Sequence, residues 1–208
     1  TLRNEIITND KPNATENDLV FDNYAVERFR LNDDPIMYPS IDWRRYLLNK
    51  TSVQTQHNLN ISGGTKDIRY FISLGFLYQN GLLKQFEGVG YDNNYKYKRY
   101  NYRANLDFDA TKTTTLKIGI GGIVGNRNEP MINDATNSIW TLINQTTPFS
   151  SPGVIDGKLI VTPEERFDNK INLGNSALPK CYGTGYSTAI NNTMNLDLLL
   201  NQKLDFIT

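Results

Sequence analysis

The amino-acid sequence predicts an all-β fold in which long antiparallel strands follow one another as a meander. Five segments alternate between apolar and polar residues with a period of two, as expected of strands with one apolar face. Short turns and long links alternate between these segments. Hydrophobic residues make up only 38% of the 208 residues, while the 12 tyrosines and 26 asparagines suit strands joined by polar loops.

The first part of the chain, residues 1–52, is polar and proline-containing, so we expect it to be mostly loop. One short helix is expected at Asn23–Arg30, where apolar residues recur on one helical face. Asp22 or Asn23 can cap the N-terminus of this helix, because a short polar side chain can accept a hydrogen bond from the first turn.

The strongest strand signal lies at Ile68–Tyr78, where six residues of one parity are large and apolar over 11 positions. Similar alternation predicts four further strands, at residues 53–62, 99–108, 115–124 and 194–201. The turns at 62–66 and 109–113 are short, which predicts two antiparallel hairpins.

The other connections, at 80–94 and 127–185, are long and rich in Gly, Asn, Asp and Pro. A link of about 60 residues is too long to be structureless inside a compact domain. We therefore expect the second link to have substructure of its own or a function.

Composition excludes several classes of protein. The 22 basic and 22 acidic residues balance, and no basic run is present, so the chain is not expected to bind nucleic acid. The single cysteine, Cys181, cannot form an intrachain disulfide, and the single histidine, His57, argues against a His-rich zinc site. No apolar run approaches the ~18 residues of a spanning helix.

Alternation alone leaves open which solvent the apolar faces meet. In a water-soluble β-sandwich they would pack on a second sheet, whereas in a transmembrane β-barrel they would meet lipid and the polar faces would line a wet lumen. The polar parity is rich in charge, and the strands are long enough for a tilted membrane crossing. Tyrosines also lie near the ends of the apolar faces, as in an interfacial aromatic girdle. The polar-face residues expected to face the lumen are Arg69, Arg99, Arg103 and Asp107.

Several blocks of sequence resemble the SusC/RagA-like family of TonB-dependent outer-membrane transporters of Bacteroidetes. They are Asp34–Trp43 (DPIMYPSIDW), His57–Thr65 (HNLNISGGT), Arg69–Phe76 (RYFISLGF), Gln79–Leu82 (QNGL), Tyr97–Asp107 (YKRYNYRANLD) and Leu204–Thr208 (LDFIT). The order and spacing of the blocks are more specific than any one of them. The resemblance implies a 22-stranded barrel that imports oligosaccharides or peptides through the bacterial outer membrane. A SusD-like surface lipoprotein would close over its extracellular mouth.

Under this resemblance, the chain is an excerpt of the barrel region. Residues 1–52 would be an extracellular segment with a short helix, and 53–126 would form four barrel strands with short periplasmic turns. Residues 127–185 would be a long extracellular loop, and 186–208 a further strand with its following turn. The plug, the segment that contacts TonB and the rest of the barrel are not in this sequence.

Loop aromatics are the candidate contacts for a substrate or a partner, because sugar rings stack on aromatic planes. These residues are Tyr38, Trp43, Tyr91, Trp140, Phe149 and Tyr182, of which Trp43 lies in a family block and is better explained by packing. Asn/Asp runs such as Asn32–Asp34 and Asp92–Asn94 offer oxygen ligands to a loop Ca²⁺, but no EF-hand spacing is present. No other cofactor and no resident metal are expected.

Catalysis is not expected. His57 lies on an apolar strand face without a nucleophile or an orienting carboxylate nearby in the sequence, and Glu164–Glu165 and Asp33–Asp34 are adjacent acids in loops. The main alternative to an importer is therefore a soluble extracellular β-sandwich that binds glycans. In that case Leu74, Ile118 and Leu198 should meet in a dry interior between two layers.

Overall fold

The computed structural model describes residues 2–132, 138–161 and 176–204, which divide into two compact units. The sheet unit comprises Thr51–Leu82, Asn94–Glu129 and Ser187–Thr208. The loop unit comprises Thr1–Lys50, Leu83–Asn93 and Pro130–Tyr186. Each unit is therefore built from three separate stretches of the chain.

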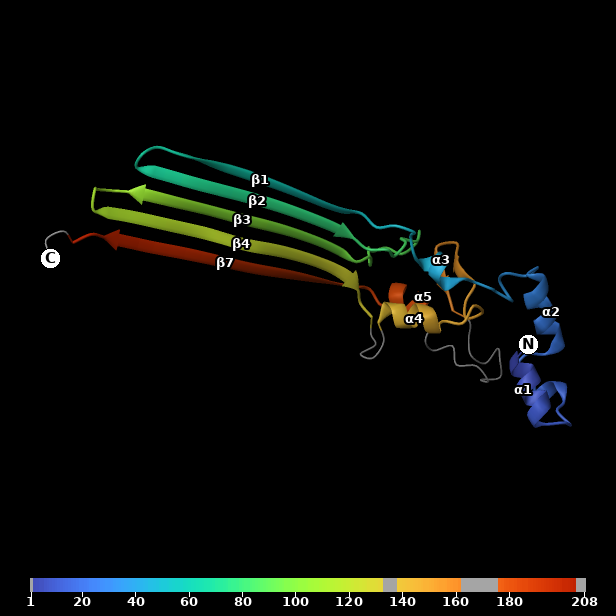
Figure 1. The fold of residues 1–208 in the computed structure, drawn as a ribbon. Coiled ribbons are helices and arrows are strands. Elements are labelled where there is room, and N and C mark those ends of the chain that lie inside the picture. Colours follow the sequence, from blue (N-terminus) through green and yellow to red (C-terminus); the bar gives the residue numbers. More distant parts are fainter. Residues whose placement is uncertain (1, 133–137, 162–175, 205–208) are drawn as a thin grey trace. The chain divides into compact units, whose positions relative to one another are not determined.

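The sheet unit holds one five-stranded sheet in the order β1-β2-β3-β4-β7 (Figure 1). Its strands are β1 (Gln54–Gly64), β2 (Ile68–Asn80), β3 (Lys96–Asp109), β4 (Thr114–Pro130) and β7 (Tyr186–Gln202). The first four pair antiparallel with their neighbours in sequence, which confirms the predicted antiparallel order. Short turns close the hairpins, with hydrogen bonds from Thr65 N to Ile68 O (2.7 Å) and from Thr111 N to Thr114 O (3.2 Å).

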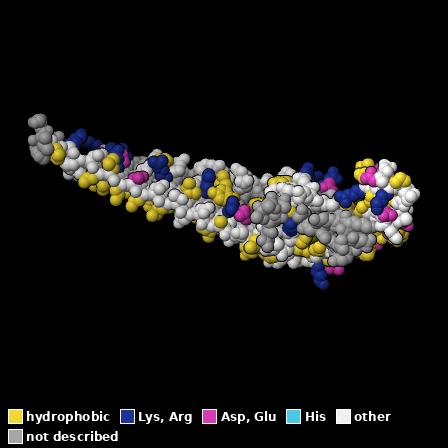
Figure 2. Space-filling view, turned by 90° about the horizontal axis from the view of Figure 1, so that it is seen from below, with side chains coloured by type: hydrophobic (Ala, Val, Ile, Leu, Met, Phe, Trp, Pro, Cys, Tyr) yellow, Lys and Arg dark blue, Asp and Glu magenta, His cyan; other side chains and the backbone are white. Residues whose placement is uncertain are grey.

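The register of the strands separates two chemically different faces. Ile72 pairs with Ala104, and Ala104 with Ile120, so these side chains share the apolar face. The neighbouring residues belong to the polar face, where Arg69 pairs with Asp107. Figure 2 views the sheet along its edge, with hydrophobic side chains following one border and Lys, Arg, Asp and Glu the other.

The apolar face of the sheet has no second layer over it among the described residues. Leu74 is 49% exposed and Leu198 is 67% exposed, whereas every buried hydrophobic side chain of the described ranges belongs to the loop unit. The dry interior that a β-sandwich requires around Leu74, Ile118 and Leu198 is therefore not formed by this part of the chain.

The loop unit contains short helices and one small hairpin. They are α1 (Leu2–Asp10), the 3-10 turn η1 (Glu16–Asp18), α2 (Asn23–Leu31), α3 (Trp43–Leu47), α4 (Ile139–Gln145), β5 (Gly153–Ile155), β6 (Lys158–Ile160) and α5 (Ala177–Tyr182). Its buried side chains include Leu47, Leu142, Leu178 and Cys181. No helix within the described ranges is long and apolar enough to cross a membrane.

The predicted helix at Asn23–Arg30 is α2, and Asp22 caps it by accepting a hydrogen bond from Ala25 N at 2.5 Å. The expectation of a single short helix was wrong, because α1, α3, α4 and α5 are present as well. Helices of five to nine residues carry too few turns for a clear periodic pattern. The link at 127–185 has substructure, as expected, because it contains α4, the β5–β6 hairpin and α5.

The buried thiol of Cys181 in α5 gives a simple test of the loop unit. Burial raises the pKa of this thiol to about 12, because the thiolate would lose its hydration. We expect iodoacetamide to leave Cys181 unmodified at pH 8 and to modify it at once in denaturant, measured by mass spectrometry. Because the unfolded thiol has a pKa of about 8.5, its contribution to stability should be present below that pH and be lost as pH rises toward 12. Rapid modification of the native protein at pH 8 would contradict the packing of α5.

Candidate functional site

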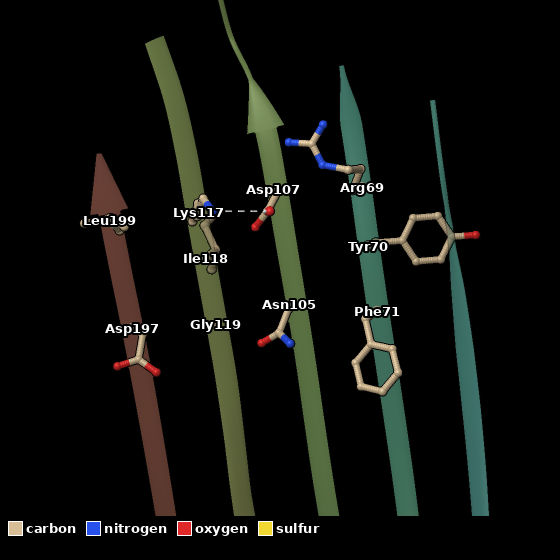
Figure 3. A pocket seen from close by; sticks show the side chains of 10 residues that line it. All are labelled: Arg69, Tyr70, Phe71, Asn105, Asp107, Lys117, Ile118, Gly119, Asp197 and Leu199. Atoms are coloured by element: carbon tan, nitrogen blue, oxygen red, sulfur yellow. Dashed lines mark ion pairs between the residues drawn. The ribbon is translucent and has the colours of Figure 1, made fainter. Parts of the chain in front are cut away.

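Two ion pairs lie near the short-turn end of the polar face. Arg69 Nη1 lies 3.3 Å from Asp109 Oδ2. Lys117 Nζ lies 3.6 Å from Asp107 Oδ2 (Figure 3). Strand register places these residues together, because Arg69 and Lys117 are the two cross-strand neighbours of Asp107. The four charges therefore balance one another locally.

Next to the ion pairs, two glycines of β4 leave the polar face without side chains. Gly119 and Gly121 lie opposite Asn105 and Arg103 of β3. Depressions of about 460 Å³ and 310 Å³ lie over them and share Asn105, Gly119 and Asp197. A Cβ atom on Gly119 would lie 3.5 Å from both Asn105 Oδ1 and Asp197 Oδ2. Two acceptor oxygens therefore flank the same open position.

The four residues predicted to face a lumen lie on this polar face. Arg69 and Asp107 line the larger depression, and Arg103 lines the smaller one. Arg99 lies opposite Leu77 and Gly125 and lines neither depression. Whether the face borders a lumen stays a prediction.

Sequence reasoning did not select Phe71 as a site residue, although its position was informative. Phe71 lies on the polar parity of β2, opposite Asn105, and lines the larger depression. It is 37% exposed. A large aromatic residue on the strand face that also carries Arg69 and Ser73 was an available signal, but only loop aromatics were predicted as contacts.

The predicted loop aromatics do not come together in one site. Tyr38 packs edge-to-face on Phe29 at 5.5 Å between centroids, and Phe149 packs on Phe21 at 5.3 Å. The two rings belong to one aromatic cluster of the loop unit, since Phe29 also contacts Phe149. Part of each ring surface is thereby used in packing.

Three of the remaining loop aromatics have internal partners. Trp43 is buried and donates from Nε1 to Thr147 O at 2.8 Å. Tyr182 is buried and donates from its hydroxyl to Lys84 O at 2.7 Å, and Tyr91 donates to Tyr182 O. Trp140 differs from these residues because half of its surface is exposed. Of the six predicted residues, Trp140 offers the most open ring, whereas Trp43 and Tyr182 support the loop unit from inside.

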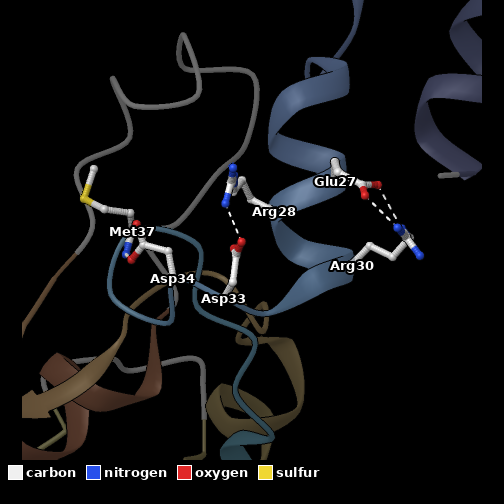
Figure 4. A network of polar contacts seen from close by, with 6 residues as sticks. All are labelled: Glu27, Arg28, Arg30, Asp33, Asp34 and Met37. Carbon is white, nitrogen blue, oxygen red and sulfur yellow. Dashed lines mark hydrogen bonds and ion pairs between the residues drawn. The ribbon is translucent and has the colours of Figure 1, made fainter.

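The acidic loop that was considered as a calcium site is held by other contacts (Figure 4). Asp33 forms an ion pair with Arg28, and Asp34 accepts a hydrogen bond from Met37 N at 2.9 Å. In the second run, Asn93 donates to Cys181 O. Among the residues that the structure describes, no group of three or more His, Cys, Asp or Glu could hold a metal ion. Glu164–Glu165 lies outside the described residues.

The apolar face has aromatic side chains toward both ends and aliphatic ones between them. Tyr70 and Phe108 lie near the short turns, and His57 stacks on Phe76 toward the opposite end. Phe76 also packs on Tyr100, with centroids 5.1 Å apart. From Tyr70 to Tyr78, the strand rises about 26 Å at about 3.3 Å per residue. This length is of the order of the lipid-facing band of a membrane barrel, about 25 Å tall.

Comparison with known proteins agrees with the resemblance of the sequence blocks. No family model matches the chain. The chain is 28% identical, over 125 residues, to the TonB-dependent receptor SusC of Bacteroides thetaiotaomicron. The matched stretch covers 53% of this chain and 12% of the length of that receptor. Over about half of its length, the chain is therefore similar to a short part of a TonB-dependent receptor.

Proposed function

We propose that this chain forms part of the wall of a TonB-dependent outer-membrane importer. The observation that carries the proposal is the single-layer sheet with two chemically opposite faces. One face is apolar and exposed, and the other has ion pairs, amides and glycine-floored depressions. A wall between lipid and a water-filled lumen needs this division, because its apolar side chains face hydrocarbon and its polar ones face water.

Strand length supports the same proposal. The paired strands run from 11 residues in β1 to 17 residues in β4. A tilted membrane crossing needs about 9–11 residues, so each of them is long enough. Further strands outside this sequence would have to close the sheet, because an unpaired backbone group in lipid costs several kcal/mol.

The cargo, partners and location in this proposal follow from the likeness to SusC and from the family resemblance. The importer would take up oligosaccharides or peptides through the bacterial outer membrane, with energy supplied through TonB. The segments 1–52 and 127–185 would lie outside the cell, where a SusD-like lipoprotein or the cargo could contact them. No bond chemistry is assigned to this segment.

A soluble glycan-binding β-sandwich would need a second layer over Leu74, Ile118 and Leu198. The described residues of this chain supply no such layer, since Leu74 and Leu198 remain exposed. A large exposed apolar face usually marks contact with another apolar surface or with a membrane. Lipid would cover this face and would also explain the aromatic bands at its ends.

Lipid contact can be tested at two adjacent positions on opposite faces of β2. Leu74→Cys and Ser73→Cys would each be labelled with a fluorescent maleimide, and the whole protein reconstituted in vesicles with brominated acyl chains. We expect strong quenching of the label at position 74, because it would lie in hydrocarbon, and little at position 73. A water-soluble thiol reagent should modify Ser73→Cys faster than Leu74→Cys. The buried Cys181 should add little background.

The matched pair controls for local flexibility, since the two positions are neighbours on one strand. Equal quenching at both positions, or none at either, would contradict a lipid-facing apolar surface. Quenching at position 73 and not at position 74 would mean that the two faces had been assigned in reverse.

A further inference from the structure

We propose that the polar face of the sheet carries a binding subsite for one neutral sugar ring, with Phe71 as platform and Asn105 and Asp197 as hydrogen-bond partners. The subsite lies over Gly119, and its lining includes none of the six predicted loop aromatics. This inference rests on the proposed function, because it gives the chemical class of a cargo that would pass along the same wall.

The platform is the ring of Phe71. Its cross-strand neighbours are Ser62 of β1 and Asn105 of β3, so the ring is flanked by small or polar side chains on both sides. In water an exposed phenyl ring is unfavourable. The C–H face of a sugar ring would cover it while leaving the hydroxyl groups at the rim free to form hydrogen bonds.

Acceptors and space lie beside the platform. Because Gly119 has no side chain, the depression of about 460 Å³ extends from Phe71 across β3 to β7 (Figure 3). Asn105 Oδ1 and Asp197 Oδ2 flank the open position over this glycine at equal distances of 3.5 Å from a Cβ placed there. Carboxylate and amide oxygens accept hydrogen bonds from hydroxyl groups. An apolar surface with a few convergent polar groups is the usual composition of a small-molecule site.

The charges around the depression favour a neutral ligand. Lys117 and Arg69 are paired with Asp107 and Asp109, so an anionic ligand would have to displace a carboxylate from its partner. Asp197 would repel such a ligand as well. A neutral hydroxyl-rich ring needs no change in these pairs, and adjacent hydroxyl groups can reach both acceptors.

The test measures binding to the detergent-solubilised whole protein by saturation-transfer NMR and calorimetry. The probes are neutral trisaccharides of glucose, mannose and xylose, with tri-alanine and tri-lysine as peptide probes. We expect a sugar to bind the wild type, Phe71→Tyr to keep that affinity, and Phe71→Leu to weaken it about tenfold. Asp197→Asn should weaken sugar binding by no more than about threefold, because the amide oxygen still accepts a hydrogen bond.

Leu77→Ala serves as the control, since Leu77 is on the same face of the same strand and lines neither depression. The subsite is overturned if no sugar binds, or if Phe71→Leu and Leu77→Ala leave the affinity equally unchanged. Binding of tri-lysine that Asp197→Asn abolishes would assign the depression to cationic ligands and overturn it too. The bromolipid experiment tests the wall independently, so a lipid-facing position 74 without sugar binding would remove the subsite and leave the proposed function standing.

Discussion

Ile120→Lys is expected to lower the free energy of unfolding of the lipid-embedded protein by about 2–4 kcal/mol, the cost of a lysine on the lipid face of a barrel near the bilayer midplane. Ile120 pairs with Ala104 on the apolar face, in the aliphatic zone between the aromatic bands. The loss would be measured by urea unfolding in vesicles and by the yield of folded protein in the outer membrane.

The same strand offers a matched control. Ile123 is a second isoleucine of β4, it is exposed to a similar degree (45% against 38% for Ile120), and it lies on the polar face opposite Asn101. Ile123→Lys should cost less than about 1 kcal/mol, because lumen water can hydrate the ammonium group. Equal effects of the two substitutions would argue that both faces meet the same solvent and would contradict the proposed wall.

Trp43→Ala is expected to lower the free energy of unfolding by about 3–5 kcal/mol, the usual cost of removing a large buried aromatic side chain. Trp43 is 3% exposed, packs edge-to-face on Tyr46 and donates a hydrogen bond to Thr147 O. The substitution leaves a cavity and removes the donor for this carbonyl. Thermal and urea unfolding, followed by near-ultraviolet circular dichroism, would measure the loss.

Trp140→Ala is the matched control, because Trp140 is the other of the chain's two tryptophans and is 50% exposed. It should change stability by no more than about 0.5 kcal/mol, as is usual for surface positions. If the two substitutions destabilised the protein equally, Trp140 would have to be buried by something other than the described residues. Its ring would then no longer be the most open of the loop aromatics.

The strands could be predicted because their signal is local. In β2, alternation over Ile68–Tyr78 locates the strand, and the short turn at 62–66 fixes its pairing with β1. The alternation of β7 is visible only from Met194, because Asn191 and Asn192 interrupt it, and a strand starting at 186 was expected only from the family resemblance. Backbone pairing continues a strand through such residues even when the side chains give no pattern.

Apart from α2 and its cap Asp22, the helices of the loop unit could not be predicted, because tertiary contacts decide their structure. Helix α3 has only five residues, and its burial depends on residues about 100 positions away, as the Trp43–Thr147 hydrogen bond shows. For the same reason, the sequence could not tell the buried Tyr182 from the exposed Trp140. Part of the candidate site on the sheet could be predicted, because strand parity places Arg69 and Asp107 on one face. The open space over Gly119 could not, because it depends on which strands become neighbours in the sheet.

The interleaving of the two units along the chain has a consequence for the order of folding. Each hairpin joins residues close in sequence, and such hairpins form within about 1–10 μs. The loop unit instead depends on pairs of high sequence separation, such as Tyr91 with Tyr182, 91 residues apart. Closing a long loop lowers the chain entropy before any stabilising contact can form. We therefore expect the hairpins to form first. The N-terminal fifty residues would then pack into the loop unit only after the polypeptide as far as α5 has been synthesised.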